Sequence, residues 1–296
     1  MQKKKKQHYV WKEYLKNWSI NNYINTILLR KNLETKVNLV NTSLENYFYT
    51  VPNYSDQDFL EILQIVDDHA SEYSRPQIIQ IISAIYKNSN LSKHFESTVQ
   101  DFAELERINM IEDFFTNIEE LGKKLIRSNS VQQIIELLKN DAEYSDALFF
   151  ISFQYVRTKK MKENVLKGIR ESNFYKEKYW LIFQIIYGFE IGIGLSIRKK
   201  IKLNFLVSKS DYNFITSDNP IFNFLENDKN EDGAVKDMEL YYPLNPKIAL
   251  IISSSDKNEI EETIINEIDI ENLNRKVYNN ALENIYFFES TDVVNL

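Results

Sequence analysis

The chain has 296 residues, of which 43% are hydrophobic and 27% are charged, and its formal net charge is -7. This is the composition of a soluble globular protein with a large core, and the negative charge argues against indiscriminate binding to nucleic acid. The absence of cysteine excludes disulfides, thiolate metal sites and cysteine nucleophiles, and it favours a reducing cytoplasm as the compartment.

The first 52 residues are expected to form a helix followed by a β-hairpin. The stretch "HYVWKEYLKNWS" (8–19) has aromatic and apolar residues at helical spacing. Residues 23–51 then indicate two short strands that meet near Lys31–Glu34, because β-branched residues alternate on both sides of this point. The lysines that precede this helix are not followed by an apolar segment, so we expect no secretory signal.

Residues 53–201 are expected to form a helical body. The apolar periodicity predicts helices over 56–68, 75–88, 96–127, 130–139, 146–169 and 174–201. The last of these is the most apolar and contains "WLIFQIIYGFEIGIGLSI" (180–197), which is barely long enough to cross a bilayer. Because it also contains Gln184 and Glu190, we expect a buried core helix and no membrane association.

Residues 202–296 have a different sequence pattern from the helical body and are expected to form a small, mostly antiparallel sheet. Short β-branched or aromatic runs predict strands at 202–208, 213–218, 239–244, 247–255 and 284–290. A last helix is expected over 258–282. With few glycines and prolines available for linkers, the whole sequence (1–296) is predicted to be a single α+β domain.

Most familiar motifs of catalysis are absent from the sequence. It contains no G-x-x-x-x-G-K-[ST] loop, no complete G-x-G-x-x-G, no H-E-x-x-H and no G-x-S-x-G. The three histidines, His8, His69 and His94, are far apart in the chain. Any chemistry must therefore come from single polar residues in apolar settings.

The first candidates are His8 and the pair Gln154 and Arg157. His8 follows four lysines, which would lower its pKa and favour a neutral ring suited to a base or a metal ligand; the alternative is an ordinary surface histidine. Gln154 and Arg157 lie three residues apart, and therefore on one face of a helix. Arg157 could hold an anion with its planar donors, or it could form a structural ion pair, for example with Glu190.

The stretch "FITSDNPIFNF" (214–224) supplies the other candidates. An apolar strand ends in Asp218 and Asn219, and Pro220 cannot continue the ladder. Rigid scaffolds often present functional side chains at such strand ends. The alternative is a capped turn, because Asp and Asn before proline form such turns unaided.

Several of these stretches together resemble the bacterial family known as domain of unknown function 4238. The similar segments include "HYV" at 8–10, "QYVRT" at 154–158, "TSDNP" at 216–220 and "YYPLNP" at 241–246, in the family's order. This chain has Trp11 and Lys159 where the family pattern has proline. The resemblance implies a fold and one shared pocket for the candidate residues. It also implies an accessory protein of the kind found beside phage-defence or mobile-element genes.

Our leading hypothesis is a cytoplasmic nuclease that acts on RNA or DNA, with a possible role in phage defence by abortive infection. His8 would be the general acid or base, Arg157 would stabilise the phosphorane, and Asp218 would orient His8 or help to hold a divalent cation such as Mg²⁺. Gln154, Asn219 and Lys159 would bind the substrate. The alternatives are a non-enzymatic sensor that recognises an anionic ligand or a phage protein, and a purely structural polar network.

Overall fold

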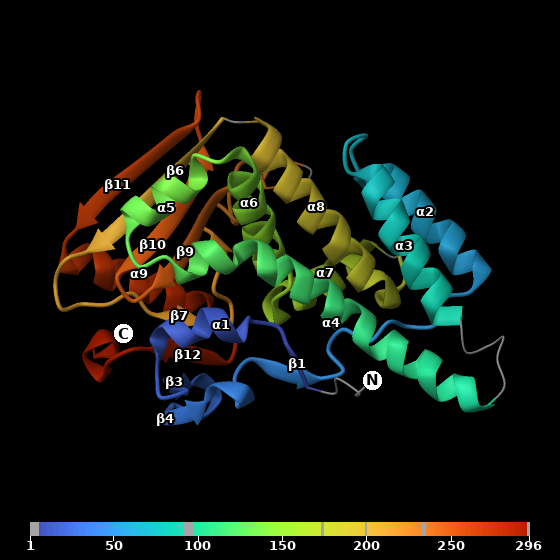
Figure 1. Cartoon of the computed structure of the whole chain (residues 1–296), viewed down its shortest axis with the longest axis horizontal. Helices are drawn as coiled ribbons and strands as arrows, with labels where there is room; N and C mark the ends of the chain where they lie inside the picture. Colours follow the sequence, from blue (N-terminus) through green and yellow to red (C-terminus); the bar gives the residue numbers. More distant parts are fainter. Residues whose placement is uncertain (1–5, 91–96, 173–174, 199, 232–234, 295–296) are drawn as a thin grey trace.

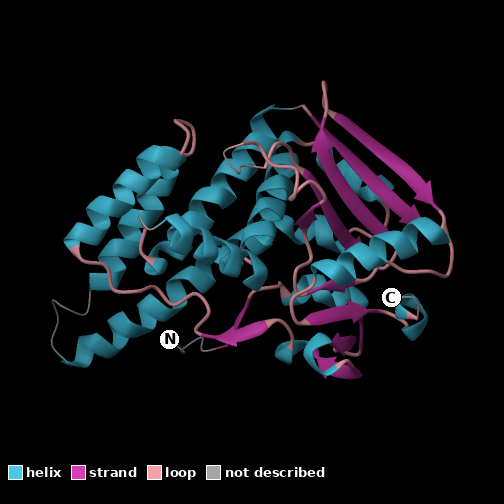
Figure 2. Cartoon of the chain, turned by 180° about the vertical axis from the view of Figure 1, so that it is seen from behind, coloured by secondary structure: helices cyan, strands magenta, loops and turns pink. Residues whose placement is uncertain are grey.

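Most of the strands lie on one side of the molecule, and over the other side extend the long helices α2 (Asp56–His69), α3 (Arg75–Asn90), α4 (Ser97–Arg127) and α8 (Trp180–Arg198) (Figure 1). The computed structural model describes residues 6–90, 97–172, 175–198, 200–231 and 235–294. Figure 2 shows the strands gathered at one end and the helices extending away from them. The α+β class predicted from the sequence is confirmed. One apolar core contains side chains from all three expected parts of the chain, among them Tyr9, Phe153 and Tyr286.

The N-terminal segment begins with a short strand instead of the expected helix. Strand β1 (Lys6–His8) pairs antiparallel with β5 (Leu44–Asn46). Helix α1 (Lys12–Leu15) follows, and a 3₁₀ turn continues it over Lys16–Trp18. The helical prediction was therefore wrong for its first residues, because His8 pairs with β5 and the N–H of Tyr9 donates to the carbonyl of Ser43.

The expected hairpin is present. Strands β3 (Tyr23–Leu28) and β4 (Leu33–Asn38) are antiparallel, and β2 (Ser19–Ile20) pairs with the start of β3. The connection contains Asn32 at φ 44°, a left-handed conformation that asparagine tolerates better than most residues.

The helical body is close to the prediction in number and extent. Its helices are α2 (Asp56–His69), α3 (Arg75–Asn90), α4 (Ser97–Arg127), α5 (Val131–Leu138), α6 (Asp141–Val156), α7 (Lys159–Ser172) and α8 (Trp180–Arg198). Helix α6 lies in the centre, where it packs against both α4 and α8. The continuous helix expected over 146–169 is interrupted, because α6 ends before Arg157 and α7 begins after Thr158.

Helix α8 is the apolar segment that raised the question of a membrane. By length and composition alone, Glu177–Ile197 could cross a bilayer, and 56% of its most apolar window is buried inside the protein. The side chains of Leu181, Ile182 and Ile185 are fully buried. Gln184 is also buried, and its amide donates a hydrogen bond to the carbonyl of Val156 on α6 at 2.6 Å.

The C-terminal strands belong to two sheets. The larger sheet has the order β11-β6-β10-β9-β8, and all its pairs are antiparallel except β11 with β6. Its strands are β6 (Ile201–Ser208), β8 (Phe222–Asn223), β9 (Glu239–Asn245), β10 (Ile248–Ser254) and β11 (Glu259–Ile265). The second sheet has the order β2-β3-β12-β7, so β7 (Thr216–Ser217) and β12 (Asn284–Phe287) extend the N-terminal hairpin.

The helix expected over 258–282 is a strand followed by a helix. Its first third forms β11, and helix α9 occupies only Glu267–Asn280. The side chain of Asn266 accepts a hydrogen bond from the backbone N–H of Asp269 and thereby caps the helix at its true start. The prediction failed here because β11 exists only through its parallel pairing with β6, a contact between distant segments.

Two helical glycines should respond in opposite ways to the same substitution. At Gly122 a Cβ would lie 2.1 Å from the ring of Phe150, whereas at Gly194 it would meet nothing within 4 Å. We expect Gly122→Ala to destabilise the protein by about 1–3 kcal/mol through overpacking. Gly194→Ala should stabilise it by about 0.5–1 kcal/mol, because alanine favours a helix. Urea denaturation of both variants checks this, and equal effects would contradict the packing described.

Candidate functional site

The predicted site residues come from segments that meet around the junction of α6 and α7. The guanidinium of Arg157 contacts the strand that carries His8, and Thr158 contacts Asn219. Lys159 pairs with Glu283, whose own backbone N–H binds Asp218. These contacts bring the segments of Arg157, Lys159, Asp218 and Asn219 together with the strand of His8. Most of the polar groups, however, bind one another within the protein.

Arg157 is buried, and its guanidinium is bound by several groups of the protein. Its side chain is only 1% exposed, and its Nη1 donates to Glu119 on α4 at 2.6 Å. Nη2 donates to the main-chain carbonyl of His8 at 2.6 Å, and Nε donates to the hydroxyl of Tyr49 at 3.2 Å. The guanidinium also lies over the ring of Phe115, 4.6 Å from its centre. Burial opposes its charge, but Tyr49 and Glu119 outweigh this and raise the pKa of Arg157.

The sequence suggested Glu190 as the ion-pair partner of Arg157, and this prediction was wrong. Arg157 pairs with Glu119, while Glu190 accepts hydrogen bonds from Ser71 and Ser74 at the start of α3. The structural interpretation of Arg157 as an ion-pair former nevertheless describes its contacts well.

Asp218 lies at the end of β7, as predicted, and is 1% exposed. Its two carboxylate oxygens accept hydrogen bonds from the backbone N–H groups of Leu282 and Glu283, at 3.0 and 2.8 Å. Burial raises the pKa of Asp218 to about 6, although these donors counteract the shift. The carboxylate thus fixes the turn between α9 and β12, and the ring of His8 is held by a different group.

Two of the three predicted substrate-binding residues, Asn219 and Lys159, lie in the same network. Asn219 accepts a hydrogen bond from the hydroxyl of Thr158 at 3.0 Å. Lys159 lies 2.9 Å from Glu283 and 3.5 Å from Glu45. Gln154 is buried at 1% exposure, and its Nε2 has no hydrogen-bond partner in the described part of the chain.

His8 is held in one tautomer at the end of β1. Its Nδ1 lies 2.9 Å from the carbonyl oxygen of Thr42, and because a carbonyl can only accept, Nδ1 must carry the proton. Burial is the largest influence on the ring and, together with Arg157 and Lys12, lowers the pKa of His8 to about 4, although the hydrogen bond with Thr42 counteracts the shift. The ring is therefore neutral at pH 7, and its Nε2 carries a lone pair.

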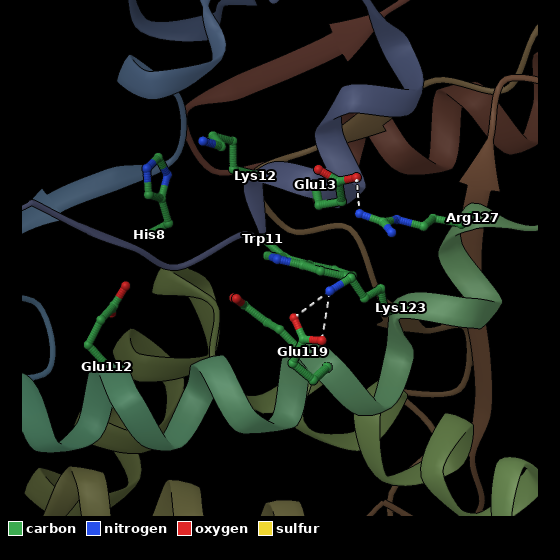
Figure 3. Close-up of a pocket in the computed structure, with 9 residues that line it drawn as sticks. His8, Trp11, Lys12, Glu13, Glu112, Glu119, Lys123 and Arg127 are labelled. Atoms are coloured by element: carbon green, nitrogen blue, oxygen red, sulfur yellow. Dashed lines mark hydrogen bonds and ion pairs between the residues drawn. The ribbon is translucent and has the colours of Figure 1, made fainter.

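His8 lines a cleft between the N-terminal segment and helix α4, which we call the His8 cleft. Its volume is about 340 Å³. Figure 3 shows Glu112 and Glu119 rising from α4 toward the segment that carries His8 and Lys12. The residues that line it are His8, Trp11, Lys12, Glu13, Glu112, Glu119, Glu120, Lys123 and Arg127.

The charges of the His8 cleft are mostly paired. Glu13 pairs with Arg127 at 3.0 Å, and Glu120 with Lys123 at 2.7 Å. Lys12 is exposed and forms no ion pair within 4.0 Å with a described residue. A ligand that entered the cleft would meet the neutral ring of His8 and the ammonium group of Lys12, beside the four glutamates that also line the cleft.

Nothing in the described residues forms a ready metal site, since no group of three or more His, Asp or Glu side chains is gathered there. Two carboxylates of the His8 cleft, Glu112 and Glu119, lie on the same side of α4, and Mg²⁺ can bind through only one or two carboxylates. Glu119, however, already accepts a hydrogen bond from Arg157.

Sequence reasoning missed the α4 side of this cleft. Glu112, Glu119, Lys123 and Arg127 follow one another at intervals of seven, four and four residues, a spacing that places them on one helix face. The same pattern is typical of an ordinary solvated face. Only the position of β1 over this helix face shows that these residues line a cleft and do not simply face solvent.

The comparisons with known proteins agree with the resemblance seen in the sequence. A family model described as "Protein of unknown function (DUF4238)" matches residues 6–291. The chain belongs to this family. No curated protein and no solved structure matches it. The match to the DUF4238 family thus covers nearly the whole chain, including the segments of His8, Arg157 and Asp218.

Replacing Arg157 should cost stability more than any surface arginine would. Arg157→Gln removes the charge that pairs with Glu119, so we expect a loss of about 3 kcal/mol in the free energy of unfolding. Arg170→Gln is the matched control, because Arg170 also pairs with a glutamate but is exposed. Its urea midpoint should equal that of the wild type. Equal midpoints for all three proteins would contradict the structural role of Arg157.

Stability should depend on pH through His8. Below pH 6.5 the unfolded chain protonates His8, whereas the folded chain does so only near pH 4, so stability falls as the pH falls through this window. We expect the free energy of unfolding of the wild type, measured relative to His8→Asn, to decrease by about 2 kcal/mol from pH 7.5 to pH 5. A difference that does not change with pH would contradict a neutral His8 in the fold.

Proposed function

We propose that the protein is a nuclease and that the His8 cleft is where it cleaves a phosphodiester of RNA or DNA. The observation that carries the proposal is the fixed tautomer of His8. Because Nδ1 donates to the carbonyl of Thr42, the lone pair of Nε2 is available to take a proton from an attacking hydroxyl or water. Because the pKa of His8 is lowered, its Nε2 is a weak base in the free protein. A phosphate bound beside the ring would raise this pKa.

Lys12 has the role of phosphate contact in this proposal. It lines the same cleft as His8, and it has no ion pair with a described residue. Arg157, which the sequence suggested for this role, acts instead through the backbone, since its Nη2 holds the carbonyl of His8. Arg157 and Asp218 are therefore positioning residues in the proposal.

A second candidate function is a non-enzymatic binding module for an anionic ligand or a protein. It is favoured by the internal use of Arg157 and Asp218, which leaves few polar groups for chemistry. In this function Lys12 and His8 would bind the anion without cleaving it. A role in phage defence stays a prediction under both functions, and so does the cytoplasmic location.

The experiment compares cleavage by four proteins. Wild type, His8→Asn, Lys12→Gln and His69→Asn are incubated with labelled cellular RNA and with single- and double-stranded DNA, each with Mg²⁺, Mn²⁺ or chelator. We expect a loss of about a hundredfold or more in His8→Asn, the usual size of a general-base contribution. His69 lies outside the cleft and serves as the matched histidine control, so its variant should retain wild-type activity.

The outcomes separate the two candidate functions. Activity that survives in His8→Asn would show that another group carries the reaction. Loss of activity in the chelator sample alone would assign the chemistry to a metal. No cleavage by the wild type would contradict the nuclease proposal, and binding of an oligonucleotide that is weakened in Lys12→Gln would then support the binding module.

A further inference from the structure

A second hollow, which we call the aromatic pocket, lies between α7, α8 and the end of α2. Its volume is about 830 Å³, within the range of small-molecule sites, and it shares no lining residue with the His8 cleft. Four of its lining residues are aliphatic. The others are His69, Asn164, Gly168, Tyr175, Phe183 and Tyr187.

One wall of the aromatic pocket is a cluster of rings around Phe183. The ring of Phe183 lies edge-on to Tyr175 at 5.2 Å and to His69 at 5.6 Å, and it is tilted against Tyr187 at 6.0 Å. Such edge-to-face contacts hold each ring in place. Tyr187 remains 37% exposed, so part of this wall faces open space.

Gly168 lines the aromatic pocket from α7. A Cβ at Gly168 would meet nothing within 4 Å, whereas at Gly122 and Gly188 it would collide with a phenylalanine ring. Glycine inside a helix costs about 0.5–1 kcal/mol relative to alanine. At Gly168 no close packing accounts for this cost, and the absent side chain leaves the pocket wide at this point.

We propose that the aromatic pocket binds an uncharged, planar aromatic molecule. The ten described residues that line it include no Lys, Arg, Asp or Glu, so a phosphate or carboxylate would lose its water against them without gaining a counter-charge. The rings of Tyr175, Phe183 and Tyr187 can pack against a planar aromatic ring by stacking or edge-to-face contact. The amide of Asn164 and the hydroxyl of Tyr175 can bond to heteroatoms at its edge.

The test uses two fluorescent probes that differ by one sulfonate group. N-phenyl-1-naphthylamine is uncharged, and 1-anilinonaphthalene-8-sulfonate has the same rings with an added sulfonate. We expect the full-length protein to bind the uncharged probe saturably, with one probe per chain, and to bind the sulfonate at least tenfold more weakly. Equal or tighter binding of the sulfonate would overturn the assignment to an uncharged ligand.

Glycine variants locate the binding. Gly168→Leu fills the pocket from a helix that tolerates leucine and should weaken binding of the uncharged probe at least tenfold. Gly194→Leu is the matched control, because its Cβ also meets nothing within 4 Å and Gly194 does not line the pocket. It should bind like the wild type.

Three further results would decide against the proposal. These are no saturable binding by the wild type, equal binding by Gly168→Leu, and equal loss in Gly194→Leu. If Gly168→Leu does not fold, Tyr187→Ser replaces it, because this partly exposed side chain can be shortened with little effect on the core. Unchanged binding by a folded Tyr187→Ser would then overturn the proposal.

Discussion

The buried guanidinium of Arg157 is the contact on which the arrangement around the His8 cleft depends. It joins β1 through the carbonyl of His8, α4 through Glu119, and the segment after β5 through Tyr49. A charge buried to this extent is tolerated only where its donors are satisfied in good geometry. The same requirement that keeps Arg157 paired therefore fixes β1 above α4, and the His8 cleft is the space between these two elements.

This arrangement divides the polar residues into two groups. Arg157, Asp218, Asn219 and Lys159 bind partners inside the protein and connect the α6–α7 junction with the end of β7 and the turn before β12. His8 instead uses one ring nitrogen to bind the backbone and presents the other without a partner among the described residues. The proposed chemistry rests on this single side chain, while the network around it supplies the geometry.

The helices and the hairpin were predictable because their signals are local. Apolar periodicity located α2 to α5 closely and α8 within wider bounds, and alternation located β3 and β4. Two elements were misassigned where a distant partner decides the conformation: β1 pairs with β5, and β11 pairs with β6. The break at Arg157 has the same origin, since its guanidinium binds groups on three other segments.

The sequence by itself determined the α+β class and the family, and it named the polar residues that the candidate site was built from. It could not determine what each polar side chain does there, because a charge turned inward can bind a ligand or another residue of the chain equally well. Only the tertiary structure decided this, by placing Glu119 beside Arg157 and backbone N–H groups beside Asp218. The physical reason is that a buried charge takes the nearest partner of suitable geometry, and that partner comes from a part of the chain far away in sequence.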